Sequence, residues 1–127
     1  MKYIGKLDIS IYRCITYDIK SEDVILTSER VQHIKDNHPN DYERYFNYMS
    51  EIIKKPDYII EANKNKHNSG VILKSFGQDD KQLKMVLRLK TSTDNPDFKN
   101  SIITFMKIDE KEWNRLIKNK KILYKAE

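Results

Sequence analysis

The chain has 127 residues, of which 39% are hydrophobic and 34% are charged. This composition predicts a single folded domain over residues 1–127 and excludes a disordered chain. With 24 Lys and Arg against 19 Asp and Glu, the formal net charge is +5. The charge favours an anionic partner, and nucleic acid is the first candidate.

Composition also bears on location and on metal binding. No stretch approaches the roughly 20 apolar residues of a membrane-spanning helix, and the start "MKYIGKLDIS" lacks the apolar run of a signal peptide. We therefore expect a cytoplasmic protein with no membrane partner. Cys14 is the one cysteine in the sequence. The sequence accordingly predicts neither a disulfide framework nor a cysteine-based zinc site.

Residues 1–27 mix short β-prone pieces with charged joints. The pieces are "YIGKL", "ISIYRCITY" and "DVILT". This pattern predicts an N-terminal arm that contains one or two strands.

Residues 28–55 are expected to form two helices. Thr27 or Ser28 can cap the first helix, which we expect to end near Asn37, because Pro39 disfavours the α conformation of the residue before it. The second helix is indicated by an apolar stripe at helical spacing, which a sheet or another helix must cover. The stripe consists of Tyr42, Tyr45, Phe46, Met49, Ile52 and Ile53.

Strand-like runs replace the helical period over residues 56–108. They lie at 57–62, 70–76, 82–91 and 101–108, and the short connection "GQDDK" suits a hairpin. We predict a four-stranded antiparallel sheet with the N-terminal helices packed on it, which makes the fold class α+β. Residues 109–127 are expected to form a short helix capped by Asp109, followed by a β-prone tail.

The strand at 82–91 has the clearest alternation. Its leucines and methionine share one parity, and the other parity carries Lys84, Val86, Arg88 and Lys90. Because successive side chains of a strand point to opposite faces, we expect one buried face and one open cationic face. Lys84, Arg88 and Lys90 are therefore predicted to bind phosphates.

The motif "RVQHIKDNHP" at 30–39 holds two of the three histidines. Arg30 and His33 share one face of the predicted helix, and His38 projects from its end. A single histidine is usually a surface or capping residue, but two beside a cationic sheet can supply a base and an acid. The spacing does not match the zinc helix His-Glu-x-x-His. We predict neither a metal nor another cofactor.

Lys74 interrupts an otherwise apolar strand. Strand alternation alone makes it a solvated lysine, whereas a functional interpretation places it beside Arg88 and Thr104, where the three could hold a phosphate. His67 lies in the polar connection "NKNKHNSG", where we expect a surface role with RNA contact.

Six pieces of the chain, in order and with suitable gaps, resemble a known family. They are "TSERVQHIKDNHP", "EIIKKPDYIIE", "GVILKSF", "LKMVLRLKT", "NSIITFMKI" and "KKILY". These pieces resemble the phage-type members of the barnase, EndoU, colicin and RelE-like (BECR) nuclease superfamily. The resemblance implies a helical N-terminal part followed by a four-stranded antiparallel sheet, and a metal-independent ribonuclease of the kind that travels with phages and other mobile elements.

The resemblance also implies an active site that spans the first helix and the sheet. The implied residues are Arg30, His33, His38, Lys74, Ser101 and Thr104. Arg88 is added from strand alternation. Ser101 and Thr104 have opposite parity on a regular strand, so both can face the cleft only if Ser101 lies at the strand entrance or in a bulge. Barnase-like members use a glutamate base, and no such carboxylate can be assigned here.

We therefore predict an endoribonuclease that leaves a 2′,3′-cyclic phosphate. His33 is the preferred base and His38 or Lys74 the acid, while Arg30 positions a phosphate. The expected partners are RNA, with tRNA as one candidate, and an inhibitor or antitoxin protein of a toxin-type nuclease. Two alternatives remain open: a catalytically silent RNA-binding module with the same cleft, and a phage-associated interaction protein with a vestigial site.

Overall fold

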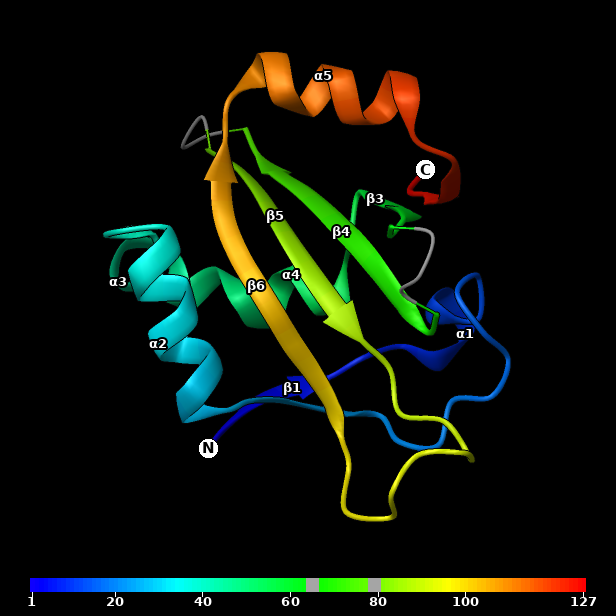
Figure 1. Cartoon of the computed structure of the whole chain (residues 1–127). Coiled ribbons are helices and arrows are strands. Elements are labelled where there is room, and N and C mark those ends of the chain that lie inside the picture. Colours follow the sequence, from blue (N-terminus) through cyan, green and yellow to red (C-terminus); the bar gives the residue numbers. More distant parts are fainter. Residues whose placement is uncertain (64–66, 78–80) are drawn as a thin grey trace.

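A seven-stranded mixed sheet forms the centre of the computed structural model, which describes residues 1–63, 67–77 and 81–127 (Figure 1). The strand order is β1-β2-β6-β5-β4-β3-β7. Neighbouring strands are antiparallel, except that β2 and β6 run parallel. The strands are β1 (Lys2–Lys6), β2 (Asp23–Leu26), β3 (Tyr58–Glu61), β4 (Ser69–Phe76), β5 (Lys81–Arg88), β6 (Asn100–Ile108) and β7 (Ile122–Lys125).

The prediction of a four-stranded sheet is wrong, because the sheet contains three further strands. Strands β3 to β6 form the expected antiparallel meander, but β1 and β2 extend it beyond β6, and β7 pairs with β3. These added strands are only four or five residues long. Pairing with distant segments, rather than local sequence, decides whether such short strands form.

The hairpin expected at "GQDDK" agrees with the pairing of β4 and β5, which continues to Phe76 and Lys81. Residues 78–80 of that turn lie outside the described residues, as do residues 64–66 of the connection that holds His67.

Helices flank the sheet on both faces (Figure 1). They are α1 (Ile9–Tyr12), α2 (Ser28–Asn37), α3 (Asp41–Tyr45), the 3₁₀ helix η1 (Phe46–Tyr48), α4 (Met49–Lys54) and α5 (Glu110–Asn119). The hydroxyl of Thr27 caps α2 by accepting the N–H of Arg30 at 3.2 Å. The carboxylate of Asp109 caps α5 by accepting the N–H of Glu112 at 2.8 Å. The prediction of Asp109 is confirmed, and of the two residues proposed to cap α2 the structure selects Thr27.

The N-terminal helices differ from the prediction in two places. The expected second helix is broken into α3, η1 and α4, and the break coincides with four weak helix formers at positions 45–48. Tyr48 lies in this break and packs on Phe76, with ring centroids 4.5 Å apart. The piece "ISIYRCITY" begins with α1 instead of a strand, because the side chain of Asp8 accepts the N–H of Ser10 and starts a helical turn.

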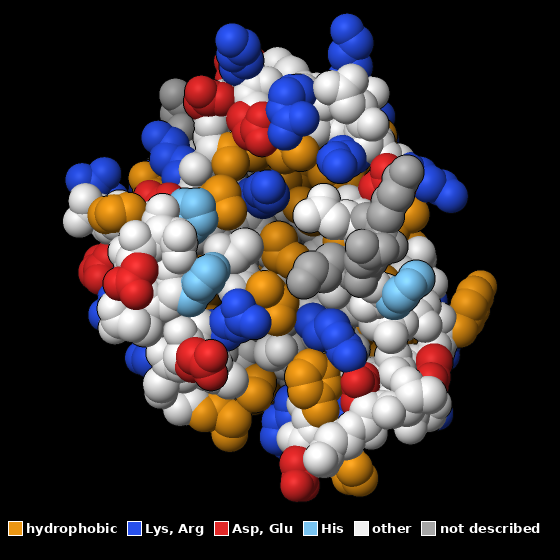
Figure 2. Space-filling view, viewed as in Figure 1, with side chains coloured by type: hydrophobic (Ala, Val, Ile, Leu, Met, Phe, Trp, Pro, Cys, Tyr) orange, Lys and Arg blue, Asp and Glu red, His pale blue; other side chains and the backbone are white. Residues whose placement is uncertain are grey.

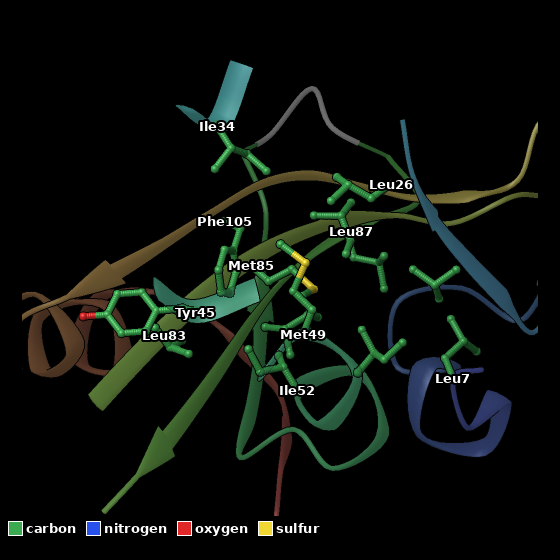
Figure 3. Packing of buried hydrophobic residues seen from close by; sticks show 14 of the residues in the cluster. Leu7, Leu26, Ile34, Tyr45, Met49, Ile52, Leu83, Met85, Leu87 and Phe105 are labelled. Carbon is green, nitrogen blue, oxygen red and sulfur yellow. The ribbon is translucent and has the colours of Figure 1, made fainter. Parts of the chain in front are cut away.

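Two hydrophobic clusters lie on opposite faces of the sheet. The larger joins one sheet face to α3, α4 and β1, and Figure 3 shows Met85, Leu87 and Phe105 packed near Met49. The smaller packs Trp113 of α5 against the other face. Helix α2 runs alongside β6 (Figure 1). Because α5 crosses only one end of its face, the rest of that face is open. None of the helices in the described ranges has the length and hydrophobicity to cross a membrane.

Asn100 joins three segments at the start of β6. Its buried amide nitrogen donates to the backbone carbonyls of Ser21 and Asp23, and its amide oxygen accepts the N–H of Lys90 at 2.7 Å. These bonds hold β2 against β6 and bring together the two ends of the connection between β5 and β6.

Candidate active site

A cleft of about 740 Å³ opens on the sheet face that α5 partly covers. Its size lies within the usual range for ligand sites, about 300–1,000 Å³. The apolar part of its lining comes from β3, β4, β5, β6 and α5 and consists of Ile60, Ala62, Val71, Val86, Ile103 and Leu116. A planar apolar group such as a nucleobase can therefore lie against it.

Cationic side chains surround this apolar lining. Figure 2 shows Lys and Arg side chains gathered around the hollow in front of the sheet, with histidine side chains on the same face. The cations that line the cleft are Arg30, Lys84, Arg88, Arg115 and Lys120. Among the described lining residues, Glu61 is the acidic one. Positive charge therefore exceeds negative charge, which favours an anionic ligand.

Strand β5 supplies two of these cations through its alternation. Its intervening apolar residues are fully buried in the larger cluster, so Lys84 and Arg88 face the cleft, as predicted. Lys84 is half-buried. Burial lowers the pKa of its ammonium group, the nearby Arg115 and Lys120 lower it further, and Glu112 opposes them.

Arg88 holds the connection that follows β5. Its guanidinium donates to both carboxylate oxygens of Asp94, at 3.1 and 2.7 Å, and lies over the ring of Phe98, 4.7 Å from its centroid. Asp94 also accepts the N–H of Thr91 at 2.8 Å. The bonds from Arg88 and Thr91 hold the pKa of Asp94 well below its usual range. The guanidinium also donates to the backbone carbonyl of Leu89. Arg88 is thus engaged within the protein, and both Arg88 and Phe98 line the cleft.

A bulge in β6 lets the side chains of Ser101 and Thr104 point to the same face of the sheet. Thr104 lies opposite Val86 and Ser101 lies opposite Arg88, so β6 has one more residue than β5 between these pairs. Directly paired residues share a sheet face. Both hydroxyl residues therefore face the same side as the cleft, and Ile103, next to the bulge, also lines it.

The hydroxyl of Thr104 has no partner. It is the one buried side-chain oxygen or nitrogen in the described part of the chain that lacks a hydrogen bond. An unpaired buried hydroxyl costs about 1–3 kcal/mol. Such a cost is common at functional sites, where a ligand supplies the missing partner.

Helix α2 lies along β6 and contributes Arg30 to the cleft. His33 follows Arg30 by one helical turn on the same helix face. Asn37, one turn further on, donates to the backbone carbonyl of His33 at 2.9 Å, and its amide nitrogen lies 3.3 Å from Nδ1 of the ring. The exposed imidazole is therefore oriented by Asn37 and keeps Nε2 free of described partners.

His38 ends α2, as predicted. Its N–H donates to the carbonyl of Ile34 at 2.8 Å, and its side chain is half-buried. The turn after it is tied to β6, because Asp41 accepts the N–H of Lys107 at 3.0 Å. Neither histidine is among the described residues that line the cleft. Both lie on the helix that borders it.

Lys74 does not lie beside Arg88 and Thr104, so the expected grouping of these three residues is wrong. It pairs with Leu83, whose side chain is buried in the larger cluster, so it points to the face opposite the cleft. Its ammonium group forms an ion pair with Asp57 at 3.3 Å. Nor is Lys74 the solvated lysine of the other interpretation, because its side chain is only 16% exposed. The register of β4 with β5, which decides its neighbours, cannot be obtained from the sequence.

Lys90 and His67 have different relations to the cleft. Lys90 follows β5, and its ammonium group donates to the carbonyl of Pro96 at 2.6 Å. It is not among the described lining residues and holds the β5–β6 connection instead. His67 is exposed and lines the cleft, which fits the surface role expected for it.

Phe98, Arg115 and Lys120 also line the cleft and are not among the residues predicted from the sequence. Phe98 is the one aromatic residue in a polar connection. The apolar face of α5, with Trp113 and Leu116, predicts a helix that packs on the sheet. Placing that helix over the cationic face would have put Arg115 near the cleft.

Among the described residues, no three His, Cys, Asp or Glu side chains are grouped in a way that would hold a metal ion.

Comparison with known proteins identifies the family. A family model described as "phage-Barnase-EndoU-ColicinE5/D-RelE like nuclease2" matches residues 3–125. The chain belongs to this nuclease family. The searches of curated proteins and of solved structures gave no match. A nuclease must bind the phosphates of its nucleic-acid substrate, and the cation-lined cleft suits that task.

The bonds to Asp94 predict how the stability of this nuclease depends on pH. A carboxyl group whose pKa is lowered by folding stabilises the protein above its unfolded pKa, about 3.9, and this contribution is lost as the pH falls further. The Asp94→Asn protein should therefore unfold at lower urea concentration than the parent at pH 7, with the difference narrowing between about pH 4 and pH 2.

Urea denaturation at several pH values measures this difference. Asp97→Asn is the matched control, since Asp97 is an exposed residue of the same connection. Equal pH dependence of the parent and the Asp94→Asn protein would show that the bonds to Arg88 and Thr91 do not stabilise the fold.

Proposed function

We propose that the protein is a metal-independent endoribonuclease that cleaves RNA by attack of a ribose 2′-OH on the adjacent phosphorus. The observation that carries the proposal is the border between α2 and β6. There Arg30 enters the cleft, His33 follows one turn later, and β6 holds the unpaired hydroxyl of Thr104. A base, a cation and a hydrogen-bond donor are the groups that this reaction requires.

In the proposed reaction His33 removes the proton of the 2′-OH, and the 2′-oxygen attacks phosphorus. The bond from phosphorus to the 5′-oxygen breaks, and His38 gives a proton to that oxygen. The products are a 2′,3′-cyclic phosphate and a free 5′-hydroxyl. His38 is preferred to Lys74 as the acid, because Lys74 is paired with Asp57 on the other face of the sheet. The two imidazoles perform both proton transfers without a metal ion.

Arg30 and Thr104 are proposed to stabilise the charge on the phosphorane oxygens. One well-placed donor contributes about 3 kcal/mol to such a transition state. The Thr104 hydroxyl is buried, so the side chains around it must shift when substrate binds. Arg88, Ser101 and Phe98 would contact the ribose or base on the same face.

The alternative is a catalytically silent RNA-binding module. Two observations favour it: neither histidine lines the cleft among the described residues, and the guanidinium of Arg88 is already bound to Asp94. Phosphate-binding cations serve a binding module as well as an enzyme. The enzyme and the binding module are therefore distinguished by analysing reaction products and not by measuring RNA affinity.

We further propose that the protein acts as a toxin-type or mobile-element nuclease on RNA in the cytoplasm, with tRNA as one candidate substrate and an inhibitor or antitoxin protein as a partner. The support is the description of the family, which names phage, colicin and RelE-like nucleases.

The reaction predicts products that can be identified directly. Purified protein incubated with total RNA in EDTA should yield fragments with 2′,3′-cyclic phosphate and 5′-hydroxyl ends. A 2′-deoxy substitution at the scissile nucleotide should stop cleavage, because it removes the nucleophile, and should leave binding nearly unchanged. Activity that needs an added divalent ion, or efficient cutting of the deoxy substrate, would contradict the mechanism. Binding without any cleavage would favour the silent module.

The histidines should be required for the rate rather than for folding. His33→Ala and His38→Ala should each lower single-turnover cleavage by roughly 10² to 10⁴ and each remove one limb of a bell-shaped pH–rate profile. His67→Ala is the control for the pH dependence: His67 is exposed and lines the cleft, so RNA binding can weaken in this variant, but both limbs of the pH–rate profile should remain. If both α2 variants melt like the parent and still cut at its rate, the histidines are not the acid and base.

The hydroxyl of Thr104 gives an independent test. Thr104→Val keeps the shape of the side chain and removes an unpaired buried hydroxyl, so the melting temperature should stay the same or rise. Cleavage should nevertheless fall by roughly 10², the usual effect of losing one transition-state donor. Thr93→Val, in the exposed β5–β6 connection, removes a hydroxyl that lies 3.1 Å from that of Thr91 and should leave the cleavage rate unchanged. A Thr104→Val protein with the parent rate would remove Thr104 from the site.

A further inference from the structure

Three cations meet at the end of the cleft that α5 covers. Lys84 enters from β5, and Arg115 and Lys120 enter from α5 and its C-terminal cap. We refer to these three residues as the α5 cation cluster. None of the three belongs to the motif "RVQHIKDNHP" or to β6, which carries Ser101 and Thr104.

The position of the cluster follows from the packing of α5. Trp113 and Leu116 are buried against the sheet in the smaller hydrophobic cluster. This anchoring fixes the rotation of the helix, so Arg115 and Lys120 lie at the border of the cleft while Leu116 forms part of its apolar lining. The cluster is thus held by a rigid element and not by a loop.

Lys84 is the least compensated member of the cluster. Its side chain is half-buried, and it forms no hydrogen bond or ion pair with any described residue. Its position opposite Leu73 and Met106 surrounds its stem with apolar groups. The pKa of its ammonium group is lowered by burial and by the two neighbouring cations. A bound anion would remove this electrostatic cost.

The nearby carboxylates form no hydrogen bond or ion pair with Lys84, although Glu112 attracts its charge from a distance. Both oxygens of Glu112 are bound to the guanidinium of Arg115. The side chain of Glu61, on the cleft lining, accepts the N–H of Lys121 at 3.2 Å. Each acidic group near the cluster therefore has its own partner, and the ammonium group of Lys84 remains available to a ligand.

We propose that the α5 cation cluster is a second phosphate subsite, which binds an RNA phosphate next to the one that is cleaved. The proposal rests on the proposed function, because it takes the ligand of the cleft to be RNA. On this proposal the substrate is an RNA chain that extends along β5 beyond the scissile bond. A dinucleotide would then fill only part of the cleft.

The spacing along the sheet supports two separate phosphates. Thr104 lies opposite Val86, and Lys84 lies two residues further along β5, about 7 Å away. This separation is comparable with the repeat of an extended sugar–phosphate backbone. A phosphate at Thr104 and its neighbour at Lys84 can therefore be bound by one strand of RNA, with a base against the apolar lining between them.

The test measures binding of single-stranded RNAs of two to six nucleotides that carry a 2′-deoxy substitution at the cleavage position. The variants are Lys84→Met, Arg115→Gln and Lys120→Gln. Methionine keeps the apolar stem of Lys84, so folding should persist, and melting curves check this. Lys118→Gln is the control on the same helix, since Lys118 is exposed and is not among the described lining residues.

For the longer RNAs each cluster variant should lower affinity by roughly tenfold, the usual effect of one lost charge-assisted hydrogen bond. The dependence of log K on log salt concentration should become less steep by about 0.7 per lost contact. The gain in affinity from a dinucleotide to longer RNA should shrink in these variants and stay complete in Lys118→Gln. Unchanged affinity and salt dependence in all three cluster variants would overturn the proposal, as would equal losses for every RNA length.

This experiment separates the subsite from the proposed catalysis. If the protein cuts no RNA but the cluster variants lose the length-dependent affinity, the ribonuclease proposal fails and the subsite stands. If RNA is cut and the ratio of kcat/KM between a tetranucleotide and a dinucleotide is the same in parent and variants, the subsite fails and the ribonuclease proposal stands.

Discussion

The end of the sheet at which β6 begins depends on the hydrogen bonds of the Asn100 side-chain amide. This amide is fully buried and bonds to the carbonyls of Ser21 and Asp23 and to the N–H of Lys90. A backbone group buried without a partner costs about 1–3 kcal/mol, so no apolar residue could replace this amide without leaving such groups unpaired. Through these bonds β2 joins β6, and the β5–β6 connection is closed into the loop that Arg88 and Asp94 then fix.

The two faces of the sheet are covered unequally, and this inequality produces the cleft. On one face the alternating apolar residues of β5 are buried under α3, α4 and β1. On the other face α5 covers only the end at Lys84, and Arg88 lies in the uncovered part. The bulge in β6 turns Ser101 and Thr104 to the same side. This member of the nuclease family thus has a cation-lined cleft, with the buried Ser101 and the buried hydroxyl of Thr104 on the same sheet face and a histidine-bearing helix at the border.

The cations of this surface are of two kinds: some are bonded to other groups of the protein, and others have no described partner. Arg88 is bound to Asp94 and Lys90 to a backbone carbonyl, so these two residues mainly hold the walls of the cleft in place. Lys84 has no such described partner, and the Thr104 hydroxyl has none either. A rigid frame with a few unpaired polar groups is the arrangement expected of a preorganised phosphate site, because binding then requires little rearrangement of the protein.

Local chemistry let the sequence alone determine the caps at Thr27 and Asp109, the end of α2 before Pro39, the strands β3 to β6 and the two faces of β5. Each of these depends on residues close together in the chain, where helical or strand period and capping act directly. Tertiary structure decided the rest. Short strands joined the sheet edges, and aromatic packing divided the helix at 41–54. Register with β5 placed Lys74 on the far face, and the packing of α5 brought Arg115 and Lys120 to the cleft. These outcomes depend on pairing between distant segments, whose geometry the periodicity of one segment cannot specify.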